Sequence, residues 1–342
     1  MSPSDIPTTT DTLLVGAGPA GIAAAVHFSR EGLDFVHVEE GEVAQTIRNF
    51  PSGVRLFSAR KDLALPDFVF GPEPEESPTR EEYIAYLERA VHRFGLTVHT
   101  RVQALSAAHT HGLHDVALET RHAGTHRLRA RNVVVASGGY FAPNILEIPG
   151  EDLPHVHHYF RSEEVSPEKR FVVVGGRNSA VEAAVNIAES GAEVVMVYRK
   201  SRLPRSKIKP WLLPRFDLQK RRGTIRVHYR SVPVSVNAEG AELREATGGL
   251  RFEPADTVFL LTGYGPDYRL LRETGVPFHR RTARPLFDEE TLETKTPGVF
   301  LCGTVALKTG GEQATIENTR DHALRMLPRI RLRLFHSRHV SS

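Results

Sequence analysis

Two features of the chain, together with its length, predict an α/β fold. The chain has 342 residues, which is roughly two domains at about 150 residues each. Short apolar runs recur along it and several are followed by helical patterning, an alternation typical of βαβ units and parallel sheets. Two of these runs lead directly into glycine-rich loops, at Gly16 and at Gly175. The sequence therefore predicts an α/β protein with two Rossmann-like dinucleotide-binding domains.

The individual elements follow from local signals. A helix from Pro19 to Glu31 begins with proline and stops at Gly32, and Thr79 with Glu82 forms a capping box before a helix over residues 83–94. Turn-rich residues 143–154 and 263–285 are predicted to be connections, and a last helix is predicted around residues 313–326. The predicted strands are Leu13–Val15, Phe35–Val38, Val133–Ala136, Phe171–Val174, Val194–Val197 and the apolar run of residues 299–302.

The composition argues against several classes of function. Lys and Arg total 44 against 41 Asp and Glu, and a net charge of +3 is too small to indicate a dedicated nucleic-acid or membrane partner. One cysteine, Cys302, excludes an intrachain disulfide and a Cys-rich metal site, and no metal-ligand spacing is found, so no metal is predicted. No run approaches the ~18 apolar residues of a membrane span, and residues 1–12 do not resemble a secretory signal. We therefore expect a cytoplasmic protein.

The first glycine-rich loop has the features of an ADP-binding unit. Gly16, Gly18 and Gly21 form a GxGxxG motif between a strand and a helix, where the helix N-terminus offers amide donors to a pyrophosphate. Glu39 ends the next strand, 23 positions after Gly16, where a carboxylate can accept hydrogen bonds from a ribose diol. A free 2′-hydroxyl fits this site, and we assign it to FAD. A glycine-rich turn without a ligand is the alternative.

The second loop repeats the design with different residues. It runs through Gly175, Gly176, Arg177, Asn178, Ser179 and Ala180, and Arg177 replaces a glycine. The next strand ends in Tyr198, Arg199 and Lys200, with Arg202 and Arg205 beyond. Basic residues at this ribose-reading position favour a 2′-phosphate, and hence NADPH over NADH. A solvated basic turn is the alternative reading. FAD in one site and NADPH in the other suggest an NADPH-dependent flavoprotein.

This order of motifs resembles the thioredoxin reductase superfamily of flavoproteins from Thr12 to about Met326. Residues 46–51 (TIRNFP) look like its segment against the isoalloxazine, while residues 135–138, 261–263 and 296–304 match its glycine-containing strand ends and C-terminal flavin motif. The resemblance implies an FAD domain (1–146 and 265–342) split around an NADPH domain (147–264). It extends the FAD candidates to Pro19, Ala20, Glu40, Gln45, Thr46, Asn49, Val102, Gly138, Gly303, Thr304, Thr315 and Ile316, and the NADPH candidates to Gly263 and Tyr264.

The detail is similar to the bacillithiol disulfide reductase group, also called bacilliredoxin reductases. The segments GGRNSA (175–180), TGYGPDY (262–268) and TIEN (315–318) carry that likeness. His158 and Tyr159 fall where thioredoxin reductases have Cys-x-x-Cys. Two residues depart from the pattern: Ala20 replaces a cysteine common in the group's first loop, and Thr304 replaces an aspartate that binds the flavin ribityl chain. Because a hydroxyl still makes one hydrogen bond, we expect weakened but surviving FAD binding.

The electron acceptor stays open at this level. A dithiol relay needs two thiols and this chain has one, Cys302, in an apolar run that favours a buried structural role. His158 and Tyr159 are the candidate proton donors, within a cluster that includes His155 and His157. We consider a reductase of a small thiol disulfide, a reductase of a protein electron carrier (ferredoxin or flavodoxin) or a quinone, and a non-catalytic flavin sensor.

The arginine-rich C-terminal stretch leaves two readings. Arg320, Arg325, Arg329, Arg331, Arg333 and Arg338 stand against one acid, Asp321. They predict a solvated helix face followed by a tail, with a patch for an anionic partner as the alternative. The superfamily suggests a homodimer or higher homo-oligomer.

Overall fold

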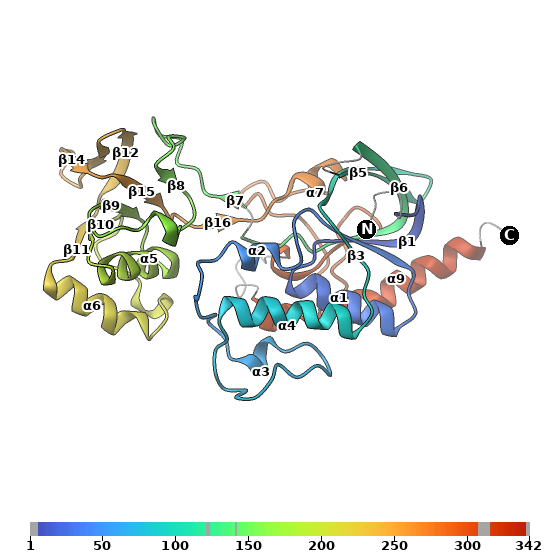
Figure 1. Ribbon diagram of the computed structural model, residues 1–342. Helices are drawn as coiled ribbons and strands as arrows, with labels where there is room; N and C mark the ends of the chain where they lie inside the picture. Colours follow the sequence, from blue (N-terminus) through green and yellow to red (C-terminus); the bar gives the residue numbers. More distant parts are fainter. Residues whose placement is uncertain (1–5, 121–123, 141, 307–314, 340–342) are drawn as a thin grey trace. The chain divides into compact units, whose positions relative to one another are not determined.

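A computed structural model describes residues 6–120, 124–140, 142–306 and 315–339 (Figure 1). The chain divides into two compact units. Unit 1 comprises residues 1–49, 53–141 and 266–342, and unit 2 comprises residues 50–52 and 142–265. Unit 1 is therefore assembled from segments on both sides of the stretch that forms unit 2. Among the helices of the described residues, none has both the length and the apolar character that a membrane crossing requires.

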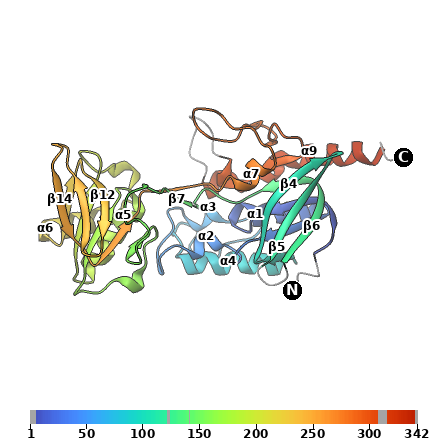
Figure 2. The same cartoon turned by 90° about the horizontal axis from the view of Figure 1, so that it is seen from above.

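Unit 1 is built on a seven-stranded sheet in the order β3-β2-β1-β6-β5-β4, with β17 also paired to β6. β1, β2, β3, β17 and the end of β6 run parallel, whereas β4, β5 and the start of β6 form an antiparallel meander that Figure 2 shows side by side. The strands are β1 (Thr9–Val15), β2 (Phe35–Glu39), β3 (Val98–Thr100), β4 (Val102–Thr110), β5 (Leu113–Thr120), β6 (Gly124–Val135) and β17 (Val299–Leu301).

Helices close the core of unit 1. α1 (Pro19–Arg30) carries an uninterrupted buried run from Gly21 to Phe28, and it packs against α4 (Arg80–Arg93) and α9 (His322–His339). α9 contributes Ala323, Met326 and Ile330 to a cluster with Phe28 of α1. The shorter helices of unit 1 are α2 (Gln45–Arg48), α3 (Arg60–Leu63), α7 (Arg269–Glu273), α8 (Ile316–Thr319) and the 3-10 helix η4 (Gly303–Val305).

Unit 2 is a parallel five-stranded sheet in the order β11-β10-β9-β15-β8. Alternate residues of β9 face two cores: Phe171 and Val173 pack with α5 and α6, whereas Val172 and Val174 pack with β12 and β13. The strands are β8 (Val156–His157), β9 (Arg170–Val174), β10 (Glu193–Tyr198), β11 (Ile225–Tyr229) and β15 (Thr257–Leu260), and the helices α5 (Asn178–Glu189) and α6 (Leu212–Arg222).

Smaller elements complete unit 2. A three-stranded antiparallel sheet is formed by β12 (Val232–Asn237), β13 (Gly240–Arg244) and β14 (Leu250–Pro254). β7 (Ala142–Pro143) pairs antiparallel with β16 (Tyr264–Gly265), so the two connections predicted from turn residues meet as a short two-stranded ribbon. The 3-10 helices are η2 (Ser162–Glu164) and η3 (Arg205–Lys207).

The α/β prediction is confirmed, and every predicted strand has a counterpart within a few residues. The predicted capping box of Thr79 and Glu82 is present at α4, which begins at Arg80. The predicted last helix differs. Gln313 lies outside the described residues, and the following segment forms the separate helices α8 and α9, because a second capping box at Thr315 and Asn318 starts a short helix that ends at Thr319.

Candidate functional site

The first glycine loop of unit 1 joins β1 to α1 at very short range. A Cβ added at Gly21 would lie 1.9 Å from the Gly16 carbonyl oxygen, so helix and loop approach as closely as only glycine allows. Gly18 differs, because a Cβ there would meet nothing within 4 Å. Its backbone borders open space at the N-cap of α1, with Pro19 at the first helical position. A ligand phosphate fits this position.

The carboxylate of Glu39 is held beside the same loop. It accepts hydrogen bonds from the Ala17 amide at 2.6 Å and from the Gly41 amide at 2.9 Å. The residue is 8% exposed. Burial raises the pKa of the Glu39 carboxyl, and the two amide bonds oppose that shift. The group that the sequence assigned to the ribose is therefore oriented before any ligand arrives.

His37 of β2 contacts the backbone of the first glycine loop. Its Nε2 lies 3.0 Å from the Gly16 carbonyl oxygen, to which a neutral ring protonated at Nε2 donates. The ring is buried, and burial lowers the pKa of His37 to about 4. A histidine within a strand carries no sequence signal for such a role, so sequence reasoning missed it.

The strand ends of β6 and β17 border the loop. Ser137 follows β6, and its buried Oγ has no hydrogen-bond partner. The neighbouring Gly139 faces Thr304, whose Oγ1 would be 3.1 Å from an added Cβ, and a Cβ on Gly303 would lie 2.6 Å from that of Ala20. The Gly303 amide donates to Nδ1 of His322 at 3.2 Å. Small residues and one orphaned hydroxyl thus gather where the sequence predicts flavin.

The other FAD candidates lie in unit 1 at different distances from this loop. The side chain of Gln45 accepts from the Glu42 amide and donates to Asn49 Oδ1, so Gln45 and Asn49 brace the turn around α2. Val102 is a buried residue of β4, and Thr315 is the N-cap of α8. Glu40 is exposed and accepts a hydrogen bond from the Gln103 side chain. The remaining candidates are Thr46 in α2, Gly138 with φ of 83°, and Ile316 at the start of α8.

The second loop, in unit 2, joins β9 to α5. A Cβ at Gly176 would lie 2.3 Å from the Tyr198 ring, so glycine lets this aromatic side chain cover the loop. Arg177 is the exposed N-cap of α5. Asn178 Oδ1 accepts from the Lys209 amide at 2.7 Å, and the buried ammonium of Lys209 pairs with Glu182 at 3.0 Å. Gly175, Ser179 and Ala180 complete the loop and the first turn of α5.

Basic side chains follow β10, as the sequence suggested. Arg199, Lys200 and Arg202 are exposed, and within the described chain their side chains make no ion pair. Arg205, in contrast, forms a two-pronged pair with Asp217 of α6, at 2.9 and 2.7 Å. Asp217, the single acid of α6, is not among the residues predicted from the sequence.

The predicted residues near the β7–β16 ribbon form an aromatic cluster in unit 2. The rings of Tyr159 and Tyr264 stack with centroids 5.0 Å apart, and the Tyr264 hydroxyl donates to the His158 carbonyl oxygen at 2.8 Å. Burial raises the pKa of both tyrosines. His158 Nε2 lies 3.7 Å from Oε1 of Glu151, whose carboxylate also accepts from the Leu146 amide. Gly263, with φ of 107°, lies beside this ribbon.

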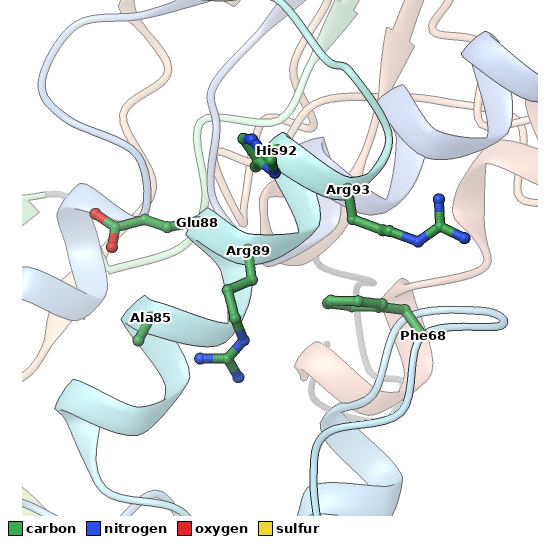
Figure 3. Close-up of a pocket in the computed structure, with 6 residues that line it drawn as sticks. All are labelled: Phe68, Ala85, Glu88, Arg89, His92 and Arg93. Atoms are coloured by element: carbon green, nitrogen blue, oxygen red, sulfur yellow. The ribbon is translucent and has the colours of Figure 1, made fainter.

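A surface hollow of about 550 Å³ lies elsewhere in unit 1, on one side of α4 (Figure 3). None of the predicted site residues lines it. Its lining residues are Phe68, Ala85, Glu88, Arg89, His92 and Arg93. Nothing in its composition connects it with either glycine loop, so we do not assign it to cofactor binding.

Arg320 at the end of α8 and arginines of α9 bind other segments of unit 1. Arg329 and Arg333 pair with Glu293 at 2.6 and 3.5 Å, and Arg331 pairs with Glu31. Arg320 donates to three backbone carbonyl oxygens of residues 61, 62 and 64. These arginines therefore have partners within unit 1, and the choice between a solvated helix face and an anionic-partner patch stays a prediction. Arg338 lies among residues whose side chains are outside the description.

Comparisons with known proteins agree with the two-loop architecture. The family model described as pyridine nucleotide-disulphide oxidoreductase matches residues 13–303. The chain is 34% identical over 310 residues to bacilliredoxin reductase Bdr of Bacillus subtilis, covering 91% of this chain and 94% of that one. It is 25% identical to a ferredoxin–NADP reductase of Ignicoccus hospitalis, covering 86% of this chain and 90% of that one.

Solved structures give the same result. Bacillithiol disulfide reductase Bdr (YpdA) from Bacillus cereus matches with a TM-score of 0.88 and 30% identity, covering 94% of this chain and 98% of that one. The Staphylococcus aureus enzyme matches with a TM-score of 0.87 and 27% identity, covering 95% and 98%. The chain therefore belongs to the pyridine nucleotide-disulphide oxidoreductase family, and it has a thioredoxin reductase-like fold.

Proposed function

We propose that this enzyme passes electrons from NADPH through FAD to a small thiol disulfide, without a dithiol of its own. When bound, FAD supplies a two-electron acceptor for hydride and a donor to the disulfide, so that NADPH, one proton and RSSR yield NADP⁺ and two RSH. Relatives named for bacilliredoxin and bacillithiol disulfide reduction make bacillithiol disulfide the first acceptor to test.

Unit 1 is proposed as the FAD unit. Its first loop offers open backbone at Gly18 for the pyrophosphate, and Glu39 offers an oriented carboxylate for the adenine ribose. The unpartnered Ser137 hydroxyl and Thr304 are the groups that would meet the flavin end. These residues fit the cofactor, because they combine backbone that a phosphate can approach closely with a buried hydroxyl that lacks a hydrogen-bond partner.

Unit 2 is proposed as the NADPH unit. The helix α5 presents its N-terminus beside Gly175 and Gly176, and its length of 12 residues gives a full helix dipole toward a pyrophosphate. Arg199, Lys200 and Arg205, on the segment that follows β10, are proposed to bind the adenine ribose 2′-phosphate, and the Tyr198 ring lies against Gly176 of the loop. In this proposal unit 1 has the FAD role that the sequence assigned to residues 1–146 and 265–342, and unit 2 has the NADPH role assigned to residues 147–264. The bounds differ, because residues 50–52, 142–146 and 265 fall in unit 2.

One observation carries the proposal that the acceptor is reduced without a protein thiol. Cys302 is the chain's one cysteine; it is 1% exposed, and burial raises its pKa to about 12. A thiol that is neither ionised nor accessible cannot attack a disulfide. The protein therefore has to position the acceptor against the flavin, and His158 and Tyr159 stay the candidate groups for handling the proton.

An anaerobic experiment in two steps tests this function. NADPH should bleach the flavin absorbance, and oxidised bacillithiol should then restore it within the turnover time. Glutathione disulfide, a ferredoxin and a quinone serve as competing acceptors. Flavin that NADPH does not reduce would contradict the first half-reaction, and reoxidation by the protein carrier alone would replace the disulfide by that carrier.

A reductase of a protein electron carrier is the second candidate. The 25% identity to a ferredoxin–NADP reductase over most of both chains favours it, as does Ala20 in place of the group's cysteine. A cytoplasmic location and a homo-oligomeric state both stay predictions from the sequence.

A further inference from the structure

We propose that Asp217 competes with the NADPH 2′-phosphate for Arg205 and so limits how strongly the enzyme prefers NADPH over NADH. This inference rests on the proposed NADPH site in unit 2. Arg205 begins η3, seven residues after Tyr198, and Asp217 lies on α6. The two residues join the segment that follows β10 to a helix packed against the same sheet.

The geometry of the pair occupies the phosphate-binding edge of the guanidinium. Nη1 and Nη2 of Arg205 donate to Oδ1 and Oδ2 of Asp217 at 2.9 and 2.7 Å. This fork is the arrangement in which arginine also binds phosphate oxygens. The hydrogen bonds to Asp217 raise the pKa of Arg205, and those from Arg205 lower the pKa of Asp217. Both groups are thus charged, and a phosphate must displace the carboxylate to use both Nη atoms.

The surroundings make this acid stand out electrostatically. Arg199, Lys200 and Arg202 are exposed on the segment just before Arg205, and Lys220 and Arg221 follow Asp217 on α6. Cations on both sides attract a 2′-phosphate to this end of β10. Asp217 works in the opposite sense, because it cancels the charge of one of these cations and repels the phosphate.

The pair is open to exchange. The Arg205 and Asp217 side chains are 54% and 34% exposed, and ion pairs of that exposure are weak, so a dianionic phosphate can compete for the guanidinium. Because each hydrogen bond to the phosphate then replaces one to Asp217, Arg205 adds little net 2′-phosphate affinity in the native chain. Removing the carboxylate frees it.

The test measures binding of 2′,5′-ADP and of AMP by calorimetry to the flavin-loaded protein. The two ligands differ in the 2′-phosphate alone. We expect Asp217→Asn to tighten 2′,5′-ADP binding by about three- to ten-fold and to leave AMP binding unchanged. Arg205→Ala should change 2′,5′-ADP binding by less than about two-fold in the native background and should abolish the gain in the Asp217→Asn background. The selectivity for NADPH over NADH in flavin reduction should rise in parallel.

A matched control separates this effect from a general change of charge. Glu189→Gln removes a carboxylate from the pair that Glu189 of α5 makes with Arg215 of α6, and it should leave both affinities unchanged. Asp217→Ser serves as a second variant should the asparagine form fold poorly. An unchanged affinity in both Asp217 variants, or the same gain without Arg205, overturns the inference while the NADPH site stands. Native protein that binds 2′,5′-ADP no better than AMP overturns both.

Discussion

The Cys302 thiol points at the carbonyl oxygen of Ala20, with Sγ and O 3.6 Å apart. This contact joins the residue that follows β17 to the first turn of α1, and it uses the chain's single thiol as a packing group. Gly303, the next residue, also packs against Ala20. The region that we propose for flavin binding thus contains a small buried thiol, 1% exposed.

Replacing Cys302 by alanine should leave catalysis intact. Because the thiol is buried and protonated, we expect turnover with a disulfide acceptor within about two-fold of the native value, and a loss of roughly 1–2 kcal/mol in the free energy of unfolding from the deleted sulfur. Steady-state rates and urea unfolding measure the two quantities. In the native protein, Ellman's reagent should label this thiol after unfolding only. If Cys302→Ala retains its FAD but no longer reduces the acceptor, Cys302 has a redox role.

Two glycine variants should separate folding from flavin binding. Gly18→Ala meets open space, so this variant should fold, yet its methyl group lies where the pyrophosphate approaches and FAD affinity should fall about ten-fold or more. Gly21→Ala forces a methyl group to 1.9 Å from the Gly16 carbonyl oxygen and should lower stability as well. Flavin absorbance per protein and the unfolding temperature of the flavin-free chain measure these effects. Full flavin content in Gly18→Ala would move the pyrophosphate away from this loop.

The two βαβ halves could be predicted from the sequence because their signals are local. A glycine loop after an apolar run, a proline at a helix start and a capping box each act within a few residues, and they placed α1, α4 and α5. The antiparallel sheet of β12, β13 and β14 was not predicted. Its strands alternate irregularly and contain polar residues such as Ser235, so their identity depends on pairing that sequence reading cannot see.

The sequence singled out residues where chemistry and spacing coincide, as for Glu39, which the structure places beside the first loop, and for the second loop; their roles in binding stay predictions. The site was not predictable where long-range packing selects the partner. The Gly303 amide donates to the His322 ring 19 residues away, and the Lys209 amide donates to Asn178 across 31 residues. Asp217 is selected by its contact with Arg205 of η3. These contacts depend on tertiary structure, which no local pattern encodes.

One substitution decides whether His158 has a chemical or a structural role. His158 Nε2 lies 3.7 Å from the Glu151 carboxylate, and alanine removes this side-chain contact. A structural role predicts that His158→Ala lowers the unfolding temperature while acceptor turnover stays within about two-fold. Tyr264→Phe, which removes a hydrogen bond to the backbone carbonyl of residue 158 and leaves the imidazole in place, is the matched variant. A turnover loss without a stability loss, together with a changed pH profile, would instead identify His158 as the proton donor.

The free energy of unfolding should fall in mild acid because burial disfavours the protonated form of two histidines in the folded chain. Burial lowers the pKa of His37 and of His114 to about 4, against about 6.5 in an unfolded chain. Between these values the unfolded chain binds more protons than the folded one, so the free energy of unfolding decreases as the pH drops from about 6.5 to 4. Each histidine contributes a slope of at most about 1.4 kcal/mol per pH unit.

Urea unfolding at several pH values measures this slope. The ring of His114 is fully buried with an unpartnered Nδ1, so His114→Leu should reduce the slope by about one proton, whereas substitution of the exposed His92 by glutamine should leave it unchanged. The variant should therefore lose stability relative to the native protein at pH 7.5 and regain part of that loss at pH 5. Parallel pH profiles for the native chain and His114→Leu would show that His114 is protonated without cost, and the acid sensitivity would then belong to other groups.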